Sequence, residues 1–124
     1  MIVIGVDVHK HSLTAVAVDE LGRQLDAVDG VGEEALIGWG RRLGRSRLWA
    51  LEDCRHVTRS LERKLQRQRQ RLVRVPARLT APQRRHGRTR GKSDAIDALA
   101  IARAALREPD LDSPRPEEAR RCGS

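Results

Sequence analysis

Four acidic residues stand where a folded chain of mixed helices and strands could gather them around a metal ion. Asp7 ends the apolar segment that opens the chain, and Glu52 ends a second apolar segment. Asp94 and Asp97 are three residues apart, so they share one face if that segment is a helix. Clustered carboxylates repel one another and require cations, and Mg²⁺ prefers oxygen ligands. Because two such ions can activate a nucleophile and stabilise a leaving oxygen, the set predicts metal-dependent phosphodiester chemistry.

Each of these acids taken alone has an ordinary structural explanation. An aspartate at a strand end commonly forms a turn, and acids in the first turn of a helix interact favourably with the helix dipole. Glu52 is followed by Asp53, and spacing leaves open which of the two faces the site. His9 and His11 alternate along a turn, and we assign them no metal role. The prediction therefore depends on the combination of four acids.

Hydrophobic periodicity in the first third of the chain predicts a strand meander followed by a helix. Alternating apolar residues predict antiparallel strands over Met1–Asp7 and Leu13–Asp19, and a third strand over Arg23–Asp29. Apolar residues at helical spacing predict a helix between Gly32 and Gly44.

The rest of the chain predicts two strands that alternate with two helices. The strands are expected at Leu48–Leu51 and Leu72–Val75, and a basic helix is expected over Arg59–Arg71, its last turn giving way to the second strand. Ser93 is a suitable N-cap for a helix over Asp94–Arg107. The resulting order, β-β-β-α-β-α-β-α, predicts an α/β protein with the mixed sheet of the ribonuclease-H-like fold. Right-handed crossovers would place the fourth strand beside the first.

The size and composition of the chain predict a small protein with one core. Its 124 residues favour a single domain over residues 1–108 and a flexible polar tail over 109–124. No apolar run approaches the roughly 20 residues of a membrane span, and no basic secretory region opens the chain, so we expect a cytoplasmic protein without a membrane partner. Cys54 and Cys122 have no histidine at metal-site spacing, which argues against a zinc site.

Basic residues are concentrated in the middle of the chain. The net charge of +8 divides into −5 over residues 1–39, +15 over 40–92 and −2 over 93–124. Such a segment predicts a nucleic-acid partner, although a solvated helix face is the alternative for the basic helix. Only two aromatic residues are present, so we expect contacts with phosphates rather than base stacking. The expected contacts are Arg59, Arg63 and Arg67 on the helix and Arg84, Arg85 and Arg88 in the following loop.

Four segments of the sequence resemble, in the same order, the transposases of the insertion-sequence 110 family. They are Ile4–Lys10, Trp49–His56, Val73–Pro76 and Arg88–Arg103, within a likeness that runs from about Met1 to Arg107. The resemblance implies a RuvC-type domain whose DEDD motif is a tetrad binding Mg²⁺ or Mn²⁺. The tetrad would consist of Asp7, Glu52, Asp94 and Asp97.

The same resemblance implies the partners and the activity. Family members recombine DNA during transposition, associate with a structured guide RNA and are expected to form homo-oligomers. Lys10, Arg90 and Lys92 stand inside matching motifs and would contact nucleic acid. Members continue into a carboxy-terminal domain with a serine nucleophile, which Ser113 and Ser124 do not match, so we expect a truncated member.

Two other functions are compatible with parts of the pattern. The first is a catalytically inactive nucleic-acid-binding module that associates with full-length transposase. The second is an actin-like or sugar-kinase ATPase, whose fold also opens with a strand ending in aspartate. That fold requires glycine soon after the aspartate so that backbone amides can bind phosphate. In this chain, those positions are occupied by Val8, His9 and Lys10.

Overall fold

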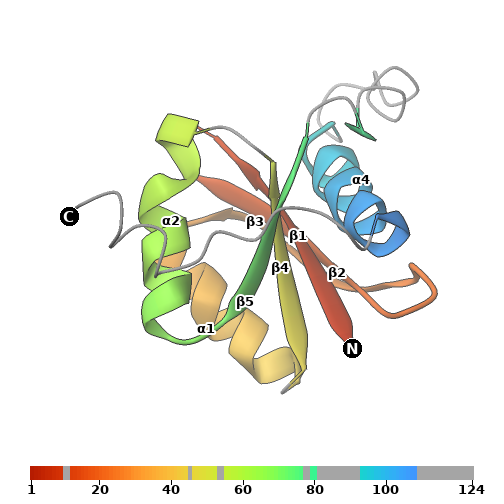
Figure 1. The fold of residues 1–124 in the computed structure, drawn as a ribbon, viewed down its shortest axis with the longest axis horizontal. Helices are drawn as coiled ribbons and strands as arrows, with labels where there is room; N and C mark the ends of the chain where they lie inside the picture. The colour runs from red at the N-terminus through yellow and green to blue at the C-terminus, as the bar shows by residue number, and fades with distance from the viewer. Residues whose placement is uncertain (10–11, 45, 53–54, 77–78, 81–92, 109–124) are drawn as a thin grey trace.

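The computed structural model describes residues 1–9, 12–44, 46–52, 55–76, 79–80 and 93–108, without the side chains of 55–57 and 93–96 (Figure 1). Its elements follow one another along the chain as three strands, a helix, a strand, a helix, a strand and a last helix. They are β1 (Ile2–Val8), β2 (Leu13–Val18), β3 (Gln24–Val31), α1 (Glu33–Leu43), β4 (Arg47–Glu52), α2 (Arg55–Arg67), β5 (Arg71–Val75) and α4 (Ser93–Arg107).

The five strands form one mixed sheet in the order β3-β2-β1-β4-β5. Strands β1, β2 and β3 pair antiparallel, while β4 is parallel to both β1 and β5. This is the sheet of the ribonuclease-H-like fold, and β4 lies beside β1 as the crossover rule predicts. The predicted fold class is therefore confirmed.

Helices cover both faces of this sheet, and each face has its own apolar core. Figure 1 shows α1 and α2 on one side of the sheet and α4 on the other. On the first side, Leu61 and Leu65 of α2 belong to the same cluster as Trp49 and Leu51 of β4. On the second side, the alanine-rich face of α4 packs with valines of β1 and β2. The sheet thus separates two surfaces of the protein.

The basic helix ends earlier than its sequence pattern predicts. We expected it to extend to Arg71, but α2 ends at Arg67, so that prediction is wrong. Arg69 has a positive φ of 57°, and the backbone N–H of Gln70 donates to the carbonyl of Leu65 at 2.9 Å. These two features terminate the helix, and the chain then continues into β5, which begins at Arg71.

Gly5 in the middle of β1 determines how closely α4 approaches the sheet. A Cβ added at Gly5 would lie 2.5 Å from the backbone nitrogen of Ala102 and closer still to the carbonyl oxygen of Ala98. Only glycine, which has no Cβ, permits this contact.

No helix in the described part of the chain is long and apolar enough to cross a membrane.

Candidate active site

Asp7 and Glu52 lie at the same level on two neighbouring parallel strands. In the register of β1 and β4, Val6 is the partner of Leu51. The next residue on each strand is the acid, so the two acids stand side by side at the carboxyl end of the sheet. Both are buried, with 8% of each residue exposed.

The two acids also lie on the same face of the sheet, the face that α4 covers. Side chains alternate along a strand, so residues two apart share a face. Ala50 belongs to the core under α4, and Glu52 is two residues further along β4. Gly5 packs directly against α4, and Asp7 is two residues further along β1.

Helix α4 runs antiparallel to β1, which brings its beginning toward these acids. Ala98 and Ala102 lie against Gly5 in the middle of β1. Further along the helix, Arg103 lies against Gly22, in the turn after β2 that adjoins the start of β1. The residues that precede Ala98 therefore lie toward the carboxyl end of β1. Asp97 is one of them, and it is half-buried.

Asp94 stands in the first turn of α4, but its side chain is outside the described part of the structure. The structure thus places Asp7 and Glu52 side by side at the carboxyl end of the sheet and Asp97 on the part of α4 that leads toward them, and it gives the backbone position of Asp94. Among the described side chains, no group of three or more histidine, cysteine or acidic residues is arranged to hold a metal ion. Asp53, the alternative to Glu52, is also outside the described residues.

His9 is a neighbour of the acids that the sequence interpretation did not assign to the site. Its Nε2 lies 3.5 Å from Oδ2 of Asp7, a close polar contact rather than a well-formed hydrogen bond. The signal was present in the sequence, because residues two apart at a strand end point the same way. His11 lies outside the described residues.

Residues 4–121 match the family model of the insertion-sequence 110 DEDD transposases, described as Transposase. The chain belongs to this transposase family. Among curated proteins, no sequence matches the chain.

The family match covers the whole candidate site of the transposase. All four acids lie between residues 4 and 121, as do α2 and α4. DEDD transposases generally use a divalent metal, and DNA is the partner that transposase chemistry requires. The resemblance on which the sequence interpretation depended is therefore confirmed at the level of the family.

The basic residues predicted to contact nucleic acid fall into two groups in this transposase. Arg59, Arg63 and Arg67 are exposed on α2, on the side of the sheet opposite α4. The other predicted contacts lie outside the described residues. They are Lys10, Arg84, Arg85, Arg88, Arg90 and Lys92.

Proposed function

We propose that this domain carries out divalent-metal-dependent phosphodiester chemistry on DNA during transposition. The metal-binding and catalytic residues are Asp7, Glu52, Asp94 and Asp97. The observation that carries the proposal is that Asp7 and Glu52 lie side by side on adjacent parallel strands and on the same face of the sheet. Helix α4, whose first turns contain the other two acids, covers that face.

The donor chemistry of these residues fits Mg²⁺ or Mn²⁺. Carboxylate oxygens are the ligands that such ions prefer, and Asp7 and Glu52 stand side by side on adjacent strands. When bound, the metal supplies Lewis-acid activation of the scissile phosphodiester and of the attacking oxygen. Asp7 and Glu52 hold their carboxylates in place because both extend from rigid strands of the central sheet.

The proposal assigns DNA binding near the acids to the basic residues that follow β1 and precede α4. These are Lys10, Arg84, Arg85, Arg88, Arg90 and Lys92. It also includes the structured guide RNA, the homo-oligomer and the division into residues 1–108 and a tail over 109–124. The sequence resemblance supports the guide RNA and the homo-oligomer, the length and composition of the chain support the division, and the charge of +15 over residues 40–92 supports the nucleic-acid contacts.

One observation favours a second candidate, a nucleic-acid-binding module that does not turn over DNA. The exposed arginines Arg59, Arg63 and Arg67 lie on the face of the sheet opposite the acids. A domain that uses only this face would bind DNA through its arginines and leave the phosphodiester intact.

Cleavage of branched DNA in the presence of Mg²⁺ or Mn²⁺ separates the two candidates. Asp7→Asn and Glu52→Gln keep the shape of each side chain and remove its charge. We expect each to lower the cleavage rate by about 100-fold or more and to leave DNA affinity nearly unchanged. The matched control is Asp19→Asn, because Asp19 caps the turn at the opposite end of the sheet. Binding without metal-dependent cleavage by the parent chain would support the second candidate instead.

A further inference from the structure

Helix α2 presents a row of three arginines to solvent. Arg59, Arg63 and Arg67 are all exposed, and they follow one another at intervals of four residues. Four residues advance an α-helix by about 6 Å, so the row spans about 12 Å on one face. The opposite face of the helix is anchored in the core by Leu61 and Leu65.

Within the described part of the structure, these three arginines have no ion-pair partner, whereas other charged residues nearby do. Nζ of Lys64 lies 2.9 Å from Oε1 of Glu33, a hydrogen bond that raises the pKa of Lys64. The carboxylate of Glu62 accepts two hydrogen bonds from the guanidinium of Arg74, each 3.0 Å long. Two charged residues of α2, Glu62 and Lys64, are therefore paired, whereas the arginines of this row are not paired with any described residue.

The row is unfavourable for the helix by itself. Like charges four residues apart destabilise a helix, and the row contains two such pairs. Packing does not compensate, because the three side chains are exposed. A polyanion bound along the row would replace the repulsion between the arginines with an attraction and would so stabilise the helix.

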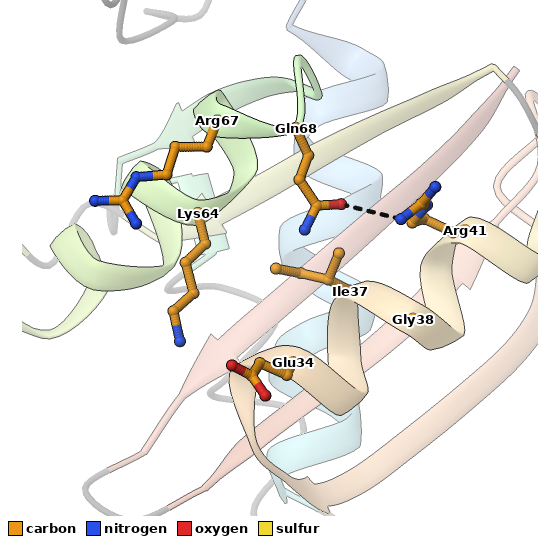
Figure 2. A pocket seen from close by; sticks show the side chains of 7 residues that line it. All are labelled: Glu34, Ile37, Gly38, Arg41, Lys64, Arg67 and Gln68. Carbon is orange, nitrogen blue, oxygen red and sulfur yellow. Dashed lines mark hydrogen bonds between the residues drawn. The ribbon is translucent and has the colours of Figure 1, made fainter.

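Two surface depressions adjoin α2, and they differ in the charges that line them. Figure 2 shows the groove between α1 and α2, of about 340 Å³, where Lys64 and Glu34 extend toward the same end. This groove is lined by an acid, Glu34, as well as by Arg41, Lys64 and Arg67. A second surface depression, of about 350 Å³, has only basic and hydroxyl side chains around it. It is lined by Arg59, Ser60, Arg63, Lys64 and Arg67.

The row and the candidate active site lie on opposite faces of the sheet. Figure 1 shows α2 and α4 on opposite sides of the sheet. Helix α2 packs with the core that contains Trp49, whereas Asp7 and Glu52 belong to the face of the sheet that α4 covers. A phosphate that contacts the row is therefore not the phosphodiester held at the acids. The two surfaces must engage different stretches of nucleic acid.

We propose that Arg59, Arg63 and Arg67 form a second DNA-binding surface, which holds the phosphate backbone of a duplex segment distinct from the one at the acids. This deepens the proposed function and rests on it. A guanidinium fits a phosphate with two parallel hydrogen bonds. No aromatic residue lines the depression, so unpaired bases have nothing to stack on, and a duplex backbone is the better fit.

The salt dependence of duplex binding tests this surface without requiring catalysis. The probe is a fluorescein-labelled DNA duplex of about 30 base pairs, long enough to cover several turns. Its affinity for the full chain is measured by anisotropy in EDTA over a series of salt concentrations. The variant is Arg59→Gln with Arg63→Gln and Arg67→Gln. The control removes the same charge from the other end of the molecule through Arg23→Gln, Arg103→Gln and Arg107→Gln.

Each phosphate contact contributes about 0.9 to the slope of log affinity against log salt. We expect the α2 variant to lower the magnitude of that slope by about 2.7 and to weaken binding at low salt by tenfold or more. The control should change the slope much less. Arg59→Lys, Arg63→Lys and Arg67→Lys keep the charge and should retain most of the slope.

Three results would overturn the proposal. They are an unchanged slope in the α2 variant, an equal change in the control, and a change confined to duplex RNA of the same sequence. Thermal unfolding of each variant identifies any loss of fold, and the lysine variant provides the folded comparison. Asp7→Asn should retain the full slope, so a failure of the proposed catalysis would be distinguishable from a failure of this surface.

Discussion

Replacing Gly5 with alanine should separate α4 from β1 and thereby disturb both the fold and the acids. The new Cβ would lie 2.9 Å from Cβ of Ala102 and 2.5 Å from its backbone nitrogen. Carbon atoms in good contact are about 3.5–4.0 Å apart, so α4 must move by about 1 Å. The obstacles are mostly backbone atoms of a helix, which cannot rotate aside as a flexible side chain would.

The cost of this movement is that of forcing an extra group into a packed core. Overpacking of this kind typically costs about 1–3 kcal/mol, and we expect about 3 kcal/mol because backbone must shift. For a chain of this size, that lowers the melting temperature by about 10 °C. A misplacement of about 1 Å at a catalytic centre can lower the rate by about 100-fold. DNA cleavage by Gly5→Ala should therefore fall further than the loss of folded protein explains.

Urea denaturation followed by circular dichroism measures the effect on stability. Gly38→Ala is the matched control, because Gly38 lies inside α1 and a Cβ there would meet nothing within 4 Å. Alanine in a helix interior is favoured over glycine by about 0.5–1 kcal/mol, so this control should stabilise the protein. An unfolding free energy for Gly5→Ala within about 0.5 kcal/mol of the parent would refute the close-approach argument.

Three further predictions concern other contacts. Nε1 of Trp39 donates to Oδ2 of Asp26 at 3.0 Å and holds the pKa of Asp26 below its usual 3.8. The hydrogen bond stabilises the protein fully at pH values above the ordinary pKa of Asp26, and this stabilisation is lost as the pH falls through the lower pKa that Asp26 has in the folded protein. Trp39→Phe should therefore destabilise the protein at neutral pH and progressively less below about pH 4. Melting curves that show the same difference at every pH would contradict it. Arg74→Met leaves the buried carboxylate of Glu62 without its bidentate partner, and urea titration should show a loss of about 1–3 kcal/mol. Mg²⁺ at about 100 times its dissociation constant should stabilise the parent by about 2.7 kcal/mol in calorimetry, and Asp7→Asn should lose this gain; equal stabilisation of both would count against the tetrad.

Most of the fold could be predicted from the sequence because each strand is bounded by clear signals. The alternating segments at the start of the chain predicted β1, β2 and β3 to within two residues. The handedness of crossovers then placed β4 beside β1 without any knowledge of contacts. The end of α2 was the exception. Arg69 reverses the chain with a positive φ where no glycine marks the turn, so the helical pattern appeared to continue.

The candidate site was less predictable, because it depends on register and on faces. The sequence identified Asp7 and Glu52 as strand ends, but it left Asp53 as an alternative. The position of Ala50 in the core under α4 places Glu52 on the face that Asp7 shares. His9 was set aside as a turn residue, and its contact with Asp7 became evident only when β1 was seen to end at Val8.

The separation of acids and arginines by the sheet has an electrostatic consequence for both proposed ligands. A guanidinium about 4 Å from a carboxylate is attracted by about 4 kcal/mol at an effective dielectric constant of 20. An α2 arginine placed beside Asp7 or Glu52 would therefore compete with a divalent ion for the carboxylate and would itself lose affinity for phosphate. Because α2 packs on one face of the sheet and the acids lie on the other, neither set neutralises the other. The acids can accept cations while the arginines accept DNA, which is the condition that simultaneous metal and duplex binding requires.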